Sequence, residues 1–194
     1  MTTSPSVVVL SGSLDPRSRT DQLALWCGRQ CAATGAAATV FRGGDLEFPI
    51  FDPVRAERPA AVRRFLTALS TSDGVVLLSP AYHGALSGLL KNALDYVADL
   101  GSADRPYLDG RSLGLAVLAG GEQGAASALA TLRAVGHALR AWPTPLGVTL
   151  CGDRAAFDLS GEPSHPDAVA QLRTMLAQVR LSRVPDVLSA PVVA

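Results

Sequence analysis

Five short apolar runs divide this chain, and each is followed by a longer segment in which apolar residues recur with helical spacing. The apolar runs are Ser6–Leu10, Ala37–Phe41, Gly74–Ser79, Leu113–Leu118 and Leu146–Leu150. They are continuous rather than alternating, as expected for parallel strands that are covered on both faces. The helical segments are approximately Arg19–Ala33, Pro59–Thr71, Ser87–Leu100, Gly124–Ala141 and Pro163–Leu181. Strands that alternate with helices in this way predict an open, doubly wound α/β sheet of five parallel strands, with helices on both faces.

Two prolines and the absence of linkers support this division into strands and helices. Pro59 and Pro163 each suit the first turn of a helix, where the missing backbone N–H breaks no hydrogen bond. The longest irregular piece is Phe41–Pro59, and no linker, repeat or low-complexity block interrupts the pattern. A chain of 194 residues is long enough to bury a sizeable core. We therefore expect residues 1–194 to form a single domain, with a loosely held tail at 184–194.

The charge balance narrows the range of partners. Seventeen basic residues match seventeen acidic ones, so the chain has no electrostatic attraction for a polyanion, and a nucleic-acid partner is disfavoured. The N-terminus lacks the basic region and apolar core of a signal peptide. No stretch approaches the roughly 20 apolar residues of a membrane span. We expect a cytoplasmic protein that binds neither nucleic acid nor membrane.

The cysteines do not form a disulfide or zinc pattern. Cys27, Cys31 and Cys151 are odd in number and contain no C-x-x-C pair. Cys27 and Cys31 stand at i and i+4 on one helix face, as either small buried side chains or a redox pair. The first interpretation is favoured, and no metal site is expected.

An open α/β sheet binds its ligand at the carboxyl ends of the strands, where the strand order reverses. For the five-strand order 2-1-3-4-5, this point lies between the first and third strands. The loops after Leu10 and after Ser79 are therefore the predicted location of a binding site.

The first of these loops is suited to a phosphate. Residues 11–20 read SGSLDPRSRT and lead directly into the first predicted helix. The start of a helix offers free N–H groups and a positive dipole end, and hydroxyls and guanidinium groups add hydrogen bonds to a dianion. The candidate residues are Ser11, Ser13, Arg17, Ser18, Arg19 and Thr20. Alternatively, Ser18 or Thr20 only caps the helix, and the loop by itself does not decide between these interpretations.

Known phosphate motifs restrict the ligand further. The loop lacks G-x-x-x-x-G-K-[ST], which excludes a nucleoside-triphosphate loop, and it lacks the G-x-G-x-x-G of dinucleotide-binding folds. The remaining candidate is a ligand with a single terminal phosphate, such as a mononucleotide.

Two further segments are suited to a flat ligand. The segment after the third predicted strand contributes Pro80, Ala81, Tyr82, His83 and Gly84. Tyr82 supplies an aromatic ring, and Gly84 lets the backbone approach a ligand closely. His83 is either a solvent-facing rim residue or a catalytic one, and the first interpretation is favoured. After the fourth strand, Gly120 and Gly121 offer bare amides to a ring edge, or form an ordinary glycine-rich turn.

These segments together resemble the NAD(P)H-dependent FMN reductase family. The segment Pro80–Asp95 is similar to the family pattern P-x-Y…G…G-x-L-K-N-A-L-D. The first loop is similar to G-S-x-R-x-x-S-R-[ST], which is matched by Gly12, Ser13, Ser18, Arg19 and Thr20. The resemblance covers about Val7 to Leu150.

The resemblance implies a flavodoxin-like fold that binds FMN and takes hydride from NADPH or NADH. It places the FMN phosphate on Ser11–Thr20 and the isoalloxazine against Pro80–Gly84 and Gly120–Gly121. It implies no dedicated catalytic acid or base, because the cofactor carries the chemistry and the protein positions it.

One residue departs from the family pattern and bears on the role of the flavin. The family often has Arg at the position of Asp15, and a carboxylate beside a phosphate weakens binding. Weak binding suits a reductase that releases reduced FMN to a separate monooxygenase, and the S-R-T ending at Thr20 is closest to reductases of that kind. The alternatives are a quinone, azo-dye or chromate reductase that keeps its FMN, and a flavodoxin-like electron carrier, which the neutral charge balance disfavours.

The resemblance also implies an oligomer. In the family, the helix that corresponds to Ser87–Leu100 packs against a partner subunit. Leu86 and Tyr96 add apolar residues beyond those that one core-facing stripe needs. We expect a homodimer or a dimer of dimers.

Overall fold

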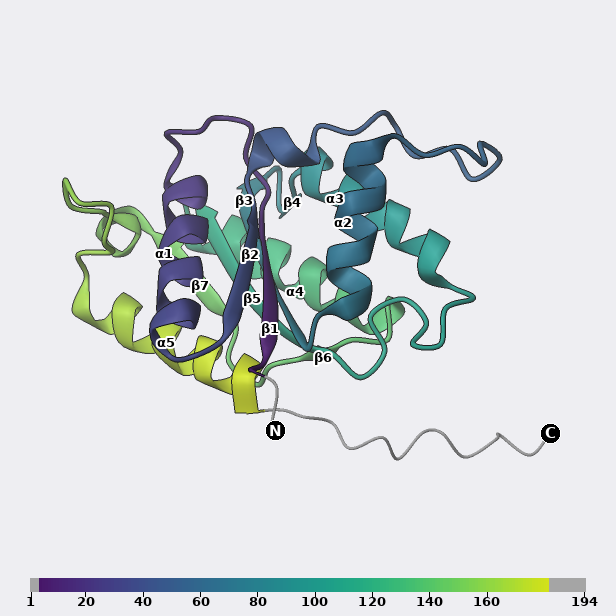
Figure 1. The fold of residues 1–194 in the computed structure, drawn as a ribbon. Helices are drawn as coiled ribbons and strands as arrows, with labels where there is room; N and C mark the ends of the chain where they lie inside the picture. The colour runs from purple at the N-terminus through teal and green to yellow at the C-terminus, as the bar shows by residue number, and fades with distance from the viewer. Residues whose placement is uncertain (1–3, 182–194) are drawn as a thin grey trace.

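The computed structural model describes residues 4–181, which fold around a central, mostly parallel sheet (Figure 1). Its five main strands, in spatial order, are β2 (Ala37–Phe41), β1 (Ser6–Ser11), β3 (Gly74–Tyr82), β5 (Ser112–Ala119) and β7 (Val148–Cys151). Each of these strands pairs in parallel with its neighbours. Counted along the chain, the five strands have the order 2-1-3-4-5, so the predicted doubly wound, flavodoxin-like fold is confirmed.

Helices cover both faces of the sheet. One face is covered by α1 (Arg19–Ala33) and α5 (Pro166–Leu181). The other face is covered by α2 (Ala60–Thr71), α3 (Gly88–Asp95) and α4 (Glu122–Ala138). Figure 1 shows the two groups on opposite sides of the strands. Short 3-10 turns follow several elements, at η1 (Gly43–Leu46), η2 (Tyr96–Leu100) and η3 (Gly152–Ala155).

Strand β1 shows why the strands are continuously apolar. Val7 and Val9 belong to the core beneath α1 and α5, whereas Val8 and Leu10 belong to the core beneath α2, α3 and α4. Successive strand residues point to opposite faces, so both alternating sets must be apolar here. Ser11 follows Val9 at a spacing of two and therefore points to the α1 face.

Helices α4 and α5 begin or end several residues from the predicted positions, and α2 begins at Ala60, so that Pro59 is its N-cap residue and not part of its first turn. Helix α5 begins at Pro166 and not near Pro163, because Pro163 forms an isolated antiparallel bridge with Phe157. Pro166 therefore occupies the first helical position that Pro163 was expected to take. Helix α4 begins at Glu122 and ends at Ala138, shortly before Arg140 adopts a left-handed φ of 61°.

The predicted helix over Ser87–Leu100 is an α-helix followed by a 3-10 turn. Ser87 is its N-cap residue, and its hydroxyl accepts a hydrogen bond from the N–H of Leu90. The α-helix ends at Asp95, which forms an ion pair with Lys91 at 2.6 Å.

The fifth strand is shorter than expected. The predicted run began at Leu146, but β7 begins at Val148, and β6 (Trp142–Pro143) forms a separate two-residue pairing with β5. Between them, Arg133 of α4 donates hydrogen bonds to the carbonyls of Thr144 and Pro145. These carbonyls therefore bond to a side chain of α4.

The segment between β2 and α2 is tied to α3. The Asn92 side chain accepts a hydrogen bond from the N–H of Phe51 at 2.8 Å and donates one to the carbonyl of Pro49 at 2.9 Å. The hydroxyl of Tyr96 also donates to Pro49. Tyr96 and Leu86 are buried within the chain itself. The expectation that these two residues are spare apolar surface for a partner subunit is therefore wrong.

Two cysteines lie inside the core beneath α1. Cys27 and Cys31 are fully buried as free thiols, and burial raises the pKa of both. A thiol that stays protonated is a poor redox group, which favours the interpretation as small core side chains.

No helix within residues 4–181 is long and apolar enough to cross a bilayer. The predicted tail at 184–194 lies outside the described residues.

Candidate cofactor-binding site

Ser11 ends β1 at the point where the strand order reverses. It is fully buried, and its hydroxyl has no hydrogen-bond partner among the described residues. Because Ser11 points to the α1 face, this hydroxyl lies on the side of the sheet where α1 begins. A buried hydroxyl without a partner is rare in folded proteins and indicates a group that an additional ligand can satisfy.

The loop between Ser11 and α1 also has free backbone donors. The N–H groups of Ser13, Leu14, Asp15, Arg19 and Thr20 make no hydrogen bond to another described residue. Those of Arg19 and Thr20 are the first donors of α1, where the helix dipole adds partial positive charge. Free amides at a helix start, next to a buried hydroxyl, make an anion site.

Ser18 is the N-cap residue of α1, as the alternative interpretation of the loop expected. Its hydroxyl accepts a hydrogen bond of 3.2 Å from the N–H of Asp21. The hydroxyl hydrogen of Ser18 is not used in this cap and can still be donated to an anion. Capping and phosphate binding are therefore compatible at this residue.

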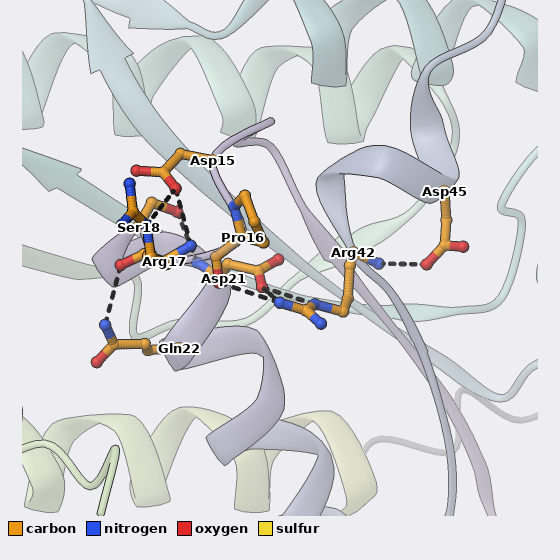
Figure 2. Close-up of polar contacts among 8 residues, drawn as sticks. All are labelled: Asp15, Pro16, Arg17, Ser18, Asp21, Gln22, Arg42 and Asp45. Atoms are coloured by element: carbon orange, nitrogen blue, oxygen red, sulfur yellow. Dashed lines mark hydrogen bonds and ion pairs between the residues drawn. The ribbon is translucent and has the colours of Figure 1, made fainter. Parts of the chain in front are cut away.

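Asp15 and Arg17 are neighbours in the loop, and both side chains are largely exposed (Figure 2). The carboxylate of Asp15 accepts a hydrogen bond of 2.9 Å from the backbone N–H of Arg17. The Arg17 side chain is 92% exposed, with its Nε 3.9 Å from the same carboxylate oxygen. Arg17 therefore lies beside Asp15, whereas Arg19 is exposed and makes no ion pair among the described residues.

Asp21 and Arg42 form an ion pair that sequence analysis missed. Asp21 lies in the first turn of α1 and is fully buried, and its Oδ2 accepts a 2.7 Å hydrogen bond from Nε of Arg42. Arg42 follows β2, and its Nη2 also donates to the carbonyl of Pro16 at 3.0 Å. The Asp21 carboxylate raises the pKa of Arg42. Figure 2 shows the guanidinium reaching from the end of β2 to both partners.

Two glycines allow the loop to lie close to its neighbours. A Cβ atom on Gly12 would lie 2.9 Å from the Ser87 hydroxyl and 3.0 Å from the Leu78 carbonyl. A Cβ atom on Gly43, the first residue of η1, would lie 1.6 Å from the carbonyl oxygen of Ser13. The loop is therefore held between the start of α3 on one side and η1 on the other.

The second predicted segment is a tight hairpin, not a loop. Strand β3 continues through Tyr82 and pairs antiparallel with β4 (Ala85–Leu86), so that only His83 and Gly84 form the turn. Their φ angles of 52° and 81° are those of a type I′ turn. Gly84 is thus required by the turn, and His83 is exposed at its first central position. Tyr82 is 58% exposed beside it.

The third predicted segment lies at the start of α4. Gly121 is its N-cap residue and provides no side-chain cap, and Cβ atoms on Gly120 or Gly121 would meet nothing within 4 Å. Glu122 is the first helical residue, and burial together with the Glu122 carboxylate raises the pKa of Cys151 at the end of β7. The thiol stays protonated, and the backbone at the two glycines is open.

These three segments meet at one edge of the sheet. The pairing of Ser11 with Leu78 and of Pro80 with Leu118 brings the ends of β1, β3 and β5 side by side. Figure 1 shows the loops that follow these strands at the same end of the molecule. Free amides and the Ser11 hydroxyl fit the phosphate of FMN, and the open glycines with exposed Tyr82 fit its flat ring.

Comparison with known proteins identifies a family and several relatives, two of which are described here. The family model described as NADPH-dependent FMN reductase matches residues 5–154. The chain is 32% identical over 135 residues to an NADPH azoreductase of Bacillus sp. (strain OY1-2), which covers 68% of this chain and 72% of that protein. It is 28% identical over 175 residues to the NADPH-dependent FMN reductase ArsH of Shigella flexneri, covering 89% of this chain and 67% of that protein.

A solved structure shares the fold. FerB, a flavoenzyme NAD(P)H:(acceptor) oxidoreductase from Paracoccus denitrificans, superposes with a TM-score of 0.75. The match covers 90% of this chain and 95% of FerB at 20% identity. At this identity the likeness supports the fold.

Proposed function

The chain belongs to the NADPH-dependent FMN reductase family, and we propose that it reduces FMN with NADPH or NADH at the carboxyl edge of its sheet. The observation that carries the proposal is the buried hydroxyl of Ser11, which lies where the strand order reverses and has no hydrogen-bond partner within residues 4–181. A buried polar group is costly unless it is hydrogen-bonded, and a phosphate oxygen of FMN would supply the missing partner.

We place the FMN phosphate in the loop between Ser11 and α1. The free N–H groups of the loop and of the first turn of α1 would donate to it, together with the hydroxyls of Ser11, Ser13 and Ser18. Thr20 is buried beside them, and the exposed Arg19 would add a charge-assisted hydrogen bond. Arg17 would have to leave Asp15 to contribute.

We place the flat ring of FMN between the β3–β4 hairpin and the start of α4. Pro80, Ala81 and Tyr82 form one wall, followed by His83 and Gly84 in the turn. The unoccupied N–H groups at Gly121 and the first turn of α4 would contact carbonyl oxygens of the ring edge. The absent Cβ atoms of Gly120 and Gly121 leave room for this approach.

When bound, FMN supplies the hydride-accepting ring, and with it the redox chemistry. The residues of this chain would bind the phosphate and orient the ring. None of them is assigned a proton-transfer role, so substitutions at the site should change flavin affinity more than a chemical step.

The Ser11→Ala variant tests this proposal. Removing a hydroxyl without a partner should leave the stability of the apo-protein unchanged or slightly higher, whereas FMN affinity should fall about tenfold or more. Ser72→Ala is the matched control, because the buried Ser72 hydroxyl donates to the Leu69 carbonyl, far from the site. This control should lose stability and keep its FMN affinity. Unchanged FMN affinity in Ser11→Ala would mean that the phosphate binds elsewhere.

We further propose that FMN exchanges during turnover and that reduced FMN is passed to a separate monooxygenase. The negative charge of Asp15 at the phosphate loop supports weak binding of a dianion. Steady-state oxidation of NADPH should then depend on added free FMN. Protein that purifies with one FMN per chain and ignores added flavin would contradict this role.

The second candidate is a reductase that keeps its FMN and reduces an azo dye or a quinone. Its support is the 32% identity to an NADPH azoreductase. In that case, NADPH oxidation should depend on the azo or quinone acceptor and should not respond to free FMN.

We also propose a homodimer or a dimer of dimers. The support comes from residues other than Leu86 and Tyr96, which are buried within the chain. Ile50 and Val54, in the segment between β2 and α2, are 83% and 88% exposed. This segment is fixed by Asn92 and by Arg58, which pairs with Asp99 at 2.7 Å. Large apolar side chains on a fixed protrusion favour contact with a second copy.

A further inference from the structure

Arg42 is the charged residue that joins the phosphate loop to the edge strand, and the known motifs of the chain do not include it. Its guanidinium bonds to the Asp21 carboxylate and to the Pro16 carbonyl, and so connects the end of β2 with the loop and with the first turn of α1. We propose that Arg42 is a positioning residue. It cancels the charge of Asp21 beneath the phosphate-binding loop between Ser11 and α1, and thereby lets this loop bind a dianion. This inference rests on the proposed FMN-binding function.

The argument starts from Asp21. It is fully buried in the first turn of α1, one residue after the free N–H of Thr20. Its Oδ1 has no hydrogen-bond partner in the part of the chain that the structure describes. A carboxylate at this position is favourable for the helix dipole but repels a second anion at the same helix start. Within the described residues, Arg42 is the one cation that contacts Asp21.

The second step concerns the net charge of the phosphate-binding loop. Asp15 and Asp21 together place two negative charges at the loop, and Arg17 is already beside Asp15. Without Arg42, an entering phosphate would meet a buried, uncompensated carboxylate, and such charges are poorly screened. With Arg42 in place, the pair is neutral, and the attraction of the free N–H groups decides binding.

Riboflavin provides the probe, because it has the same ring as FMN and lacks the phosphate. The ratio of FMN affinity to riboflavin affinity, measured by flavin fluorescence titration, therefore reports the contribution of the phosphate alone. Arg42→Met keeps the length of the side chain and removes its charge. It should lower this ratio at least about fivefold, the factor that corresponds to about 1 kcal/mol of electrostatic free energy.

Asp21 variants make the test specific to charge cancellation. Asp21→Asn should raise the ratio, because it removes the carboxylate that pairs with Arg42 and leaves more of the positive charge of Arg42 beside the phosphate. The double variant Asp21→Asn with Arg42→Met should return the ratio to within about threefold of the wild type, because both charges are gone. If Arg42→Met does not fold, Asp21→Asn alone carries the test, and an unchanged or lower ratio overturns the proposal.

Arg29→Met is the matched control. Arg29 lies on α1, as Asp21 does, and its side chain is about as exposed as that of Arg42. It pairs with Glu162 at 2.7 Å, away from the loop. Its ratio should equal that of the wild type. A parallel loss of FMN and riboflavin affinity in Arg42→Met would indicate a merely structural role and overturn the proposal.

The outcomes also separate this proposal from the proposed function. If the wild type binds FMN and riboflavin equally, the proposed phosphate site in the loop between Ser11 and α1 is wrong. A wild type that prefers FMN, with an unchanged preference in Arg42→Met, would overturn only the role of Arg42.

Discussion

The carboxylate of Asp15 accepts a hydrogen bond of 2.9 Å from the backbone N–H of Arg17, two residues further along the β1–α1 loop. The Ser18 N–H bonds to the Asp15 carbonyl at 3.0 Å, so one residue shapes the whole turn. Asp15 therefore has two opposite effects on a phosphate: its bonds hold the loop, and its charge repels the ligand.

Asp15→Asn separates these effects. The amide oxygen of Asn can still accept the Arg17 N–H, while the negative charge is removed. FMN affinity should rise about fivefold, the effect of about 1 kcal/mol at a partly exposed site, and riboflavin affinity should not change. Asp15→Arg should also bind FMN more tightly and release it more slowly. Fluorescence titration and stopped-flow release measure both, and FMN binding in Asp15→Asn no tighter than in the wild type would contradict the expectation.

Gly84→Ala tests the conformation of the β3–β4 turn. Gly84 has a φ of 81°, which a residue with a Cβ adopts at a cost of about 1 kcal/mol or more. Thermal unfolding should therefore show a lower melting temperature. Gly88→Ala serves as the control, because Gly88 is the exposed first residue of α3, where a Cβ would meet nothing within 4 Å. Equal melting temperatures for the two variants would refute the turn assignment.

The sequence was sufficient to predict the elements whose ends carry local signals. Helix α1 has the predicted bounds, because Ser18 caps its start and Gly35, with a φ of 84°, lies just beyond its end. The extension of β3 through Pro80 was not predictable, since proline lacks the N–H of a central strand. The Leu78 carbonyl accepts a hydrogen bond from the Gly12 N–H on the β1 side of β3. Because backbone groups two residues apart in a strand face the same neighbour, the Pro80 nitrogen also faces the β1 side, where β1 has already ended.

The site was predictable only in part, for a similar reason. The loops after β1, β3 and β5 follow from the strand order, and the sequence motifs lie in them. Arg42, which follows β2, contacts Asp21, and Gly43 of η1 lies against Ser13. No local pattern relates residues so far apart in the chain. Only the register of β1 with β2, which pairs Leu10 with Phe41, brings them together.

Gly43→Ala tests the support of the loop by η1. The added methyl group would overlap the carbonyl of Ser13, so either η1 or the loop must move. Because the loop has few contacts of its own, we expect it to shift and FMN affinity to fall about tenfold or more. Gly44→Ala is the control, since a Cβ on Gly44 would meet nothing within 4 Å. If both variants bind FMN like the wild type, the close contact is not needed for the site.

The last prediction concerns the exposed protrusion between β2 and α2. Ile50 and Val54 make few contacts within the chain, so the double variant Ile50→Asp with Val54→Asp should fold and melt like the wild type. If these side chains contact a second copy, each aspartate would bury a charge at the interface, which is strongly unfavourable. Light scattering at micromolar concentration should therefore show a smaller assembly for the variant than for the wild type. Leu159→Asp is the control, because Leu159 is fully exposed elsewhere, and it should keep the wild-type mass. A wild type that is already monomeric would exclude the oligomer, and a variant that keeps the wild-type mass would place the interface on another surface.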